Sequence, residues 1–168
     1  MRREQVERLY EQYGPALVAY GCAIARNRAT AEDLVQQVFL KLLKAGSAEP
    51  ENARAYLYRA VRNAALNSLR GAARETDLEP EQAWFATAAG AVDGAIHDAL
   101  ALQSALLALP PEQREVIVMH IWGGMTFEEI AGVMGIPANT AASRYRYGLA
   151  KLRARMQPRP ENSYAAKE

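Results

Sequence analysis

The sequence contains only one cysteine, Cys22, and two histidines, His97 and His120, among 168 residues. A single cysteine excludes an internal disulfide and a thiolate-rich zinc site, and this usage favours a reducing cytoplasm. The two histidines lie far apart and have no cysteine or histidine near them in the sequence. We therefore expect no metal site and no other cofactor, and we expect Cys22 to be a small apolar core residue.

No stretch of the chain reaches the roughly 20 consecutive apolar residues needed to cross a bilayer. The first 25 residues place arginines before an apolar stretch, as an export signal does, but Glu4, Glu7 and Glu11 interrupt the pattern. We therefore expect a soluble, cytoplasmic protein that does not insert into a membrane.

The first 70 residues lack the alternation of apolar and polar residues that marks a strand, and no period repeats along the chain. Their apolar residues recur at helical spacing. This pattern predicts a helix over residues 3–24 and another over residues 53–70. Between them, Thr30 is the expected N-cap of a further helix, with Asp33 as the acid of a loose capping box. The expected fold class is all-α.

The net charge of +1 hides an uneven distribution. Residues 1–70 carry 11 basic and 7 acidic side chains, residues 71–100 carry 1 and 6, and residues 101–168 carry 8 and 6. We expect two small helical domains, over residues 1–72 and 99–156, joined by an acidic linker over residues 73–98. Residues 157–168 are expected to be a disordered tail, and Trp84 and Phe85 are a candidate docking point within the linker.

A helix-turn-helix is predicted in the C-terminal domain. Thr126 and Glu129 form a capping box, which starts a helix. Gly135 favours the left-handed conformation that ends it, and Pro137 is suited to a fresh helical start. A turn of about three residues crosses two helices steeply, and the second helix of such a pair can lie in a DNA major groove.

The second of these helices has an apolar face and a basic face. The apolar face is formed by Ala141, Tyr145, Leu149, Leu152 and Met156. No acidic residue occurs between residues 138 and 159, where the basic residues are Arg144, Arg146, Lys151, Arg153, Arg155 and Arg159. A charge run alone fits a solvated surface equally well. Following a cap, a short turn and a glycine, it favours DNA binding.

A second basic stretch lies between residues 52 and 74. It combines five arginines and no acid with Tyr56 and Tyr58. Such a mixture fits single-stranded nucleic acid, because guanidinium groups bind phosphates while rings stack on bases. Taken alone, the stretch is explained more simply by packing tyrosines and solvated arginines.

Four blocks of sequence resemble one family in order and spacing. They read LYEQYGPALVAYG, AEDLVQQVFLKLL, AYLYRAVRNAALNSLR, and LPPEQREVIVMHIWGGMTFEEIAGVMGIPANTAASRYRYGLAKLR. The chain resembles the extracytoplasmic-function sigma factors, the two-domain minimal members of the sigma-70 family of bacterial transcription initiation factors. A lone helix-turn-helix is a weak signal, whereas four ordered blocks are a strong one.

The resemblance implies roles for the N-terminal residues. The polar face of the second helix docks on a coiled coil of the polymerase clamp in this family, and the matching residues are Asp33, Gln36 and Gln37, the last standing where an acid is common. The next block melts and captures the non-template strand of the minus-ten element. Its matching residues are Arg54, Tyr56, Tyr58, Arg59, Arg62, Asn63, Asn67 and Arg70. Asn67 replaces a frequent aspartate and can donate as well as accept hydrogen bonds.

The resemblance also assigns the helix-turn-helix to duplex DNA of the minus-thirty-five element. The matching residues are Asn139, Thr140, Ala142, Ser143, Arg144 and Arg146. Ala142 departs from the usual lysine or arginine and offers only a methyl contact. The acidic linker also fits the resemblance, because the linker of this family threads through positively lined channels of the polymerase.

The resemblance therefore implies a promoter-specificity subunit without a catalytic site, whose partners are bacterial core RNA polymerase, promoter DNA and an anti-sigma factor. The alternatives are a decoy that mimics a sigma factor and binds an anti-sigma factor, and a dimeric helix-turn-helix regulator. A nuclease lacks support, because no cluster of carboxylates or histidines has metal-ligand spacing. The main interpretation would be contradicted if Arg62, Arg144 and Arg146 were turned inward and neutralised by acidic neighbours.

Overall fold

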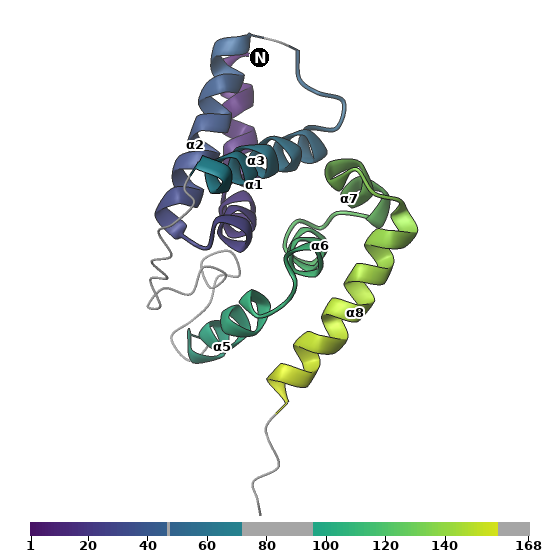
Figure 1. The fold of residues 1–168 in the computed structure, drawn as a ribbon. Helices are drawn as coiled ribbons and strands as arrows, with labels where there is room; N and C mark the ends of the chain where they lie inside the picture. Colours follow the sequence, from purple (N-terminus) through teal and green to yellow (C-terminus); the bar gives the residue numbers. More distant parts are fainter. Residues whose placement is uncertain (47, 72–95, 158–168) are drawn as a thin grey trace, which may run out of the picture.

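The computed structural model describes residues 1–46, 48–71 and 96–157, and every regular element in that part of the chain is an α-helix (Figure 1). The all-α expectation is confirmed. Residues 73–95 of the expected linker, with Trp84 and Phe85, and the tail from residue 158 onward lie outside the described residues, whereas residues 96–98 of the expected linker are helical. Among the described helices, none is long and apolar enough to cross a membrane.

Three helices form the N-terminal unit: α1 (Arg3–Ala25), α2 (Arg28–Ala45) and α3 (Ala53–Gly71). Helix α1 runs through Pro15 without ending, close to the predicted bounds. Helix α3 begins after Asn52, whose side chain accepts from the backbone amide of Ala55 at 2.9 Å. The buried side chains of this unit include Leu17, Tyr20, Val35, Leu57 and Val61. Each helix thus contributes one apolar face to a shared core.

The predicted N-cap of α2 was wrong. Thr30 lies inside the helix, and Asn27 is the N-cap, accepting from the backbone amide of Thr30 at 2.9 Å. Asn27 has extended backbone angles, which aim its short side chain at the free amides of the first turn. Arg26, in the left-handed region, ends α1 immediately before it. The tight connection between the two helices therefore starts α2 earlier than Thr30.

The C-terminal unit contains α5 (Ile96–Leu107), α6 (Pro111–Ile121), α7 (Phe127–Met134) and α8 (Ala138–Met156). Thr126 caps α7, and its capping box with Glu129 is complete, as predicted. Gly135 ends α7 with φ of 68°, a conformation in which a side chain is strained. The steep crossing of α7 and α8 is the predicted helix-turn-helix (Figure 1).

The buried face of α8 differs slightly from the expected one. Ala141, Gly148 and Leu152 are buried, whereas Met156 is 42% exposed. At Gly148, an added Cβ would lie 2.8 Å from Cδ1 of Ile117 and 3.0 Å from Cβ of Gln113, so a side chain there would require α6 side chains to shift. The expected apolar face of α8 did not include Gly148, because glycine is not a large hydrophobic residue, although Gly148 lies at the contact with α6.

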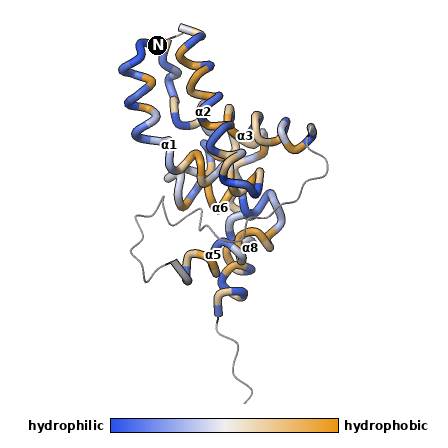
Figure 2. Tube along the Cα trace, turned by 90° about the vertical axis from the view of Figure 1, so that its left-hand side faces the viewer, coloured by the Kyte–Doolittle hydropathy of each residue, from blue (hydrophilic) through white to orange (hydrophobic). Residues whose placement is uncertain are grey.

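The two units pack against each other. Helix α1 contacts α6, and α3 contacts α7. Buried hydrophobic residues of both units belong to one continuous cluster. Figure 2 shows hydrophilic and hydrophobic residues alternating along the helices, as expected for helices with one buried face. The two units therefore have a defined arrangement, which the sequence left open.

Candidate polymerase and nucleic-acid interfaces

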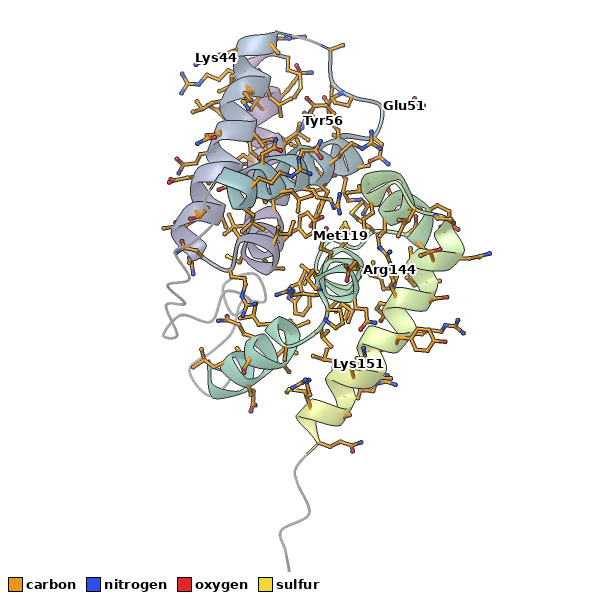
Figure 3. The ribbon with its side chains drawn as sticks, in the orientation of Figure 1. Lys44, Glu51, Tyr56, Met119, Arg144 and Lys151 are labelled. Carbon is orange, nitrogen blue, oxygen red and sulfur yellow. The ribbon has the colours of Figure 1, made fainter. Side chains whose placement is uncertain are left out.

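Helix α3 presents one exposed stripe of polar and aromatic side chains. Its members recur at spacings of three and four, which places them on one face of a helix. They are Tyr56, Arg59, Asn63, Asn67 and Arg70, all exposed. Tyr56 retains 46% of its surface and lies near the start of the helix (Figure 3). Five of the eight residues predicted for the minus-ten strand thus share a surface that a strand could follow.

The other three predicted residues face the C-terminal unit. Arg54, Tyr58 and Arg62 recur every four positions on a neighbouring face of α3. Tyr58 has no exposed surface and packs on Tyr20 with ring centroids 5.1 Å apart. Burial raises the pKa of the Tyr58 hydroxyl. In this arrangement Tyr58 is a packing residue and has no ring face available for a base.

Arg54 is held by the start of α7. Its Nη2 donates to both carboxylate oxygens of Glu129, at 2.8 and 2.7 Å, and its Nη1 donates to the carbonyl of Gly124 at 2.9 Å. Asn52 adds a hydrogen bond to Glu129 at 3.0 Å. The bonds from Arg54, helped by Asn52 and the Thr126 amide and opposed by burial, lower the pKa of Glu129 from 4.5 to about 2. Glu129 is therefore both a member of the α7 capping box and an ion-pair partner of α3.

Arg62 is paired deeper in the molecule. Its Nε donates to Oε2 of Glu115 at 2.8 Å, and the Tyr20 hydroxyl donates to the same oxygen at 2.9 Å. The side chain of Glu115 is 7% exposed and that of Arg62 is 21% exposed. Burial and the adjacent carboxylate raise the pKa of Tyr20. Burial lowers the pKa of Arg62, but the hydrogen bond and charge of Glu115 outweigh it and give a net increase.

The expectation of free arginines is therefore wrong for Arg62. It does not fail for the other two: Arg146 is exposed, and Arg144 is partly exposed. Sequence reasoning missed Glu115 and Tyr20, and it saw Glu129 only as a cap. One signal in the sequence could have indicated Glu115. It is an acid directly before the apolar stretch Val116–Met119, and an acid buried with such a stretch requires a partner for its charge.

Two further contacts join α3 to the C-terminal unit. Arg59 donates from Nη2 to the carbonyl of Gly132 at 2.7 Å, although its side chain also belongs to the exposed stripe. An added Cβ at Gly123 would lie 2.8 Å from the Tyr58 hydroxyl and still closer to the carbonyl of Met119. The close approach of α3 to the turn before α7 therefore depends on glycine at this position.

Helix α8 presents its N-terminal half outward. Asn139 and Arg146 are exposed, and Tyr147 is 64% exposed. The other residues predicted for the minus-thirty-five element are partly exposed: Thr140, Ala142, Ser143 and Arg144. Basic residues continue along the helix, where Figure 3 marks Arg144 and Lys151. An exposed, basic second helix of a helix-turn-helix has the chemistry needed to contact duplex DNA.

An aromatic cluster fixes α8 relative to α6 and α7. The His120 ring stacks on Phe127 with centroids 4.7 Å apart and meets Tyr145 edge-on at 4.7 Å. His120 Nδ1 also lies 2.8 Å from the Met125 carbonyl. One residue from each of three helices thus meets at the turn, and the orientation of α8 is set by packing.

Helix α2 presents a polar face to solvent. Asp33, Gln36 and Gln37 are all exposed, opposite the buried Leu34 and Val35. Leu40 follows on the same face and is 52% exposed, which sequence reasoning did not single out. A single exposed leucine is normal on a protein surface, but this one stands beside the three polar side chains of α2.

Cys22 is buried, and burial raises the pKa of its thiol to about 12. Within the described ranges, no group of three or more histidine, cysteine, aspartate or glutamate residues is placed to hold a metal ion.

Comparison with known families identifies both units. The Sigma-70 region 2 model matches residues 9–75, and the Sigma-70, region 4 model matches residues 99–152. The RNA polymerase sigma factor CarQ of Myxococcus xanthus is 32% identical over 90% of this chain and 88% of its own length. The ECF RNA polymerase sigma factor SigL of Mycobacterium tuberculosis is 30% identical over 89% of this chain and 87% of its own.

Solved structures share the fold. The sigma factor RpoE of Bartonella quintana, crystallised with the anti-sigma factor NepR, superposes with a TM-score of 0.68 at 23% identity. The match covers 90% of this chain and 96% of that one. Sequence and fold agree across both units, so the chain belongs to the extracytoplasmic-function group of the sigma-70 family of RNA polymerase sigma factors.

Proposed function

We propose that this sigma factor assigns its three binding tasks to three helices. Helix α2 binds core RNA polymerase, α3 binds the separated minus-ten strand, and α8 reads the minus-thirty-five duplex. The observation that carries the proposal is that each of these helices has an outward face of polar or basic side chains which the packed core does not use. Residues 1–72 and 99–156 are the proposed functional domains.

The polymerase surface consists of Asp33, Gln36 and Gln37, to which we add Leu40. A carboxylate and two carboxamides supply directional hydrogen bonds, and the leucine supplies apolar area at the centre of the contact. Because Gln37 is uncharged, one contact in this surface is a hydrogen bond where an acid would form an ion pair.

The minus-ten surface is the exposed stripe of α3. Tyr56 offers a ring for stacking on a base, and Arg59 and Arg70 offer guanidinium groups to phosphates. Asn63 and Asn67 can both donate and accept, which suits base edges that are exposed when strands separate. We also retain Arg54, Tyr58 and Arg62 as strand-binding residues, on the condition that the C-terminal unit moves away from them.

The minus-thirty-five surface is the N-terminal half of α8. Asn139, Ser143, Arg144 and Arg146 supply hydrogen bonds to base edges and phosphates. Thr140 and Ala142 supply methyl contacts of the kind that recognise thymine. Each mismatched base pair costs about 1 to 3 kcal/mol, so two short elements discriminate promoters when both are engaged.

The same proposal covers the remaining expectations. The protein contributes no catalytic group, so polymerase performs the chemistry. It works in the cytoplasm, where polymerase and promoter are found. A structural relative was crystallised with an anti-sigma factor, and we propose that an anti-sigma factor regulates this chain as well.

The direct test is reconstitution with purified core RNA polymerase. We expect the wild-type protein to bind core and to give promoter-dependent transcripts. The variant Gln36→Lys/Gln37→Lys should fold normally but lose core binding, because two cations replace the hydrogen-bonding face. A complex that forms but never initiates would favour the decoy function, and undiminished binding by the variant would remove α2 from the interface.

A further inference from the structure

Part of the proposed minus-ten surface is already occupied by the protein itself. The guanidinium groups of Arg54, Arg59 and Arg62 all donate hydrogen bonds to acceptors of the C-terminal unit. The acceptors are the carboxylates of Glu129 and Glu115 and the carbonyls of Gly124 and Gly132. Three cations on one helix therefore meet a row of oxygen atoms from α6, α7 and the turn before α7.

These acceptors have the chemistry of a nucleic-acid backbone. A carboxylate resembles a phosphate in presenting two anionic oxygens to a guanidinium group. Glu129 receives Arg54 on both oxygens. Along the axis of α3, the stretch from Arg54 to Arg62 extends about 12 Å. Over this length, two acidic side chains and two carbonyls thus supply the acceptors for three arginines of α3.

The contact is built into the packing of both units. Glu115 and the Tyr20 hydroxyl are buried together with part of Arg62. Gly123 allows the close approach to Tyr58, and the buried hydrophobic cluster continues across the contact. The packed arrangement is therefore a specific state of the chain. Buried contacts hold it in addition to the partly exposed ion pair between Arg54 and Glu129.

With the two units packed together, the chain spans too short a distance to bind both promoter elements. Elements named for positions minus ten and minus thirty-five lie about 25 base pairs apart, which is about 85 Å along B-form DNA. A compact chain of this length has a radius of gyration of about 15 Å. Contact between α3 and α7 therefore has to be broken before α3 and α8 can bind the two elements at once.

We propose that the C-terminal unit is an intramolecular competitor of the promoter strand, with Glu115 and Glu129 as its strand-mimicking groups. This proposal rests on the role of α3 proposed above. The closed state covers Arg54, Tyr58 and Arg62 but leaves the polar face of α2 and the outward half of α8 exposed. Polymerase and duplex can therefore engage the closed protein first, and the strand-binding face becomes available only after the units separate.

The test uses the full-length chain and compares Glu129→Gln with Glu128→Gln. Glutamine retains the reach needed for the capping box, but it weakens the ion pair with Arg54. Glu128 is exposed in the same turn of α7 and has no side-chain bond to α3 among the described residues. Both variants change the net charge equally, so any difference between them comes from the interface. A third variant, Glu115→Gln/Glu129→Gln, removes both carboxylates.

Two measurements are made on each variant. Small-angle scattering measures the radius of gyration, and fluorescence anisotropy measures affinity for a labelled mixed-sequence single-stranded 20-mer. We expect the double variant to have a larger radius of gyration and to bind the strand about tenfold more tightly than wild type. The reason is that a larger fraction of its molecules has the units apart and α3 free to bind. The strand affinity of Glu129→Gln should lie between those of wild type and the double variant, and that of Glu128→Gln should match wild type within twofold. A duplex of the same sequence should show no difference between Glu129→Gln and Glu128→Gln.

Equal strand affinity of Glu129→Gln and Glu128→Gln, with unchanged radii, would overturn the proposal. If the double variant unfolds, Glu129→Gln decides the question, because Glu129 lies at the rim and its variant retains the cap. Failure of the proposed function is a separate result: wild type would give no promoter-dependent transcript with core polymerase. Normal transcription together with indistinguishable glutamate variants would reject the intramolecular competitor alone.

Discussion

At the residue scale, Glu115 shows how one buried acid joins the two units. It accepts from Tyr20 on α1 and from Arg62 on α3. Removing the tyrosine hydroxyl by Tyr20→Phe leaves the carboxylate with one donor in place of two. We expect the free energy of unfolding to fall by about 1 to 2 kcal/mol, measured by urea denaturation. Tyr10→Phe is the matched control, because Tyr10 is 45% exposed, and it should change stability by less than about 0.5 kcal/mol.

Glu129 predicts a pH dependence. Its pKa is lowered from 4.5 to about 2 in the folded protein, first by its hydrogen bonds with Arg54. Because the folded pKa lies below the ordinary value, its stabilising contribution is complete above about pH 4.5 and is lost as the pH falls toward 2. The difference in unfolding free energy between wild type and Glu129→Gln should therefore shrink as the pH falls from about 4.5 toward 2. Urea denaturation at several pH values measures it, and a difference that stays constant would contradict the ion pair.

At the element scale, the turn between α7 and α8 depends on Gly135. Its φ of 68° strains any side chain, so Gly135→Ala should cost about 1 kcal/mol of stability and weaken duplex binding by tilting α8. Gly132→Ala is the control of opposite sign. Gly132 lies within α7, where an added Cβ comes no nearer than 3.7 Å to the Arg59 guanidinium. Alanine there should raise stability by about 0.5 to 1 kcal/mol. Thermal unfolding distinguishes the two, and destabilisation of equal size would argue against the turn geometry.

Helix α8 makes a prediction about salt. If Arg144 and Arg146 each neutralise one phosphate, replacing both with alanine should reduce the slope of log affinity against log salt by about 2. Binding of duplex promoter DNA is measured by anisotropy over a range of salt concentrations. Arg3→Ala is the control, because Arg3 lies on α1 and pairs with Glu7 at 2.7 Å. An unchanged slope in the double variant would remove both arginines from the DNA interface.

The helices themselves were largely predictable, because their start and stop signals are local. Thr126 and Glu129 cap α7, and Gly135 ends it, as their residue types indicate. Asn27 was overlooked because asparagine and threonine are both favoured at N-caps, and Asn27 stands three residues before Thr30. Periodicity located the buried face of α8 but assigned Met156 to it, since a pattern does not show where the partner helix ends.

At the scale of the whole molecule, the contact between the two units could not be predicted from the sequence. Arg62 and Glu115 are 53 positions apart, and Arg54 and Glu129 are 75 apart. No local rule connects residues at such separations. The basic stretch on α3 was visible in the sequence, but its pairing with Glu115 and Glu129 is a property of the packed chain. Predicting surfaces from charge alone therefore overestimated how many arginines are free.

We expect this chain to direct core polymerase to promoters through two separate DNA contacts, one on α3 and one on α8. The most direct measurement is transcription from genomic fragments by core polymerase with the purified protein, with start sites mapped at nucleotide resolution. We expect discrete start sites that share two short upstream elements at constant spacing. They should be lost when Arg144 and Arg146 are replaced or when Tyr56 and Arg59 are replaced. Start sites that share no elements, or that are unaffected by either pair of substitutions, would contradict it.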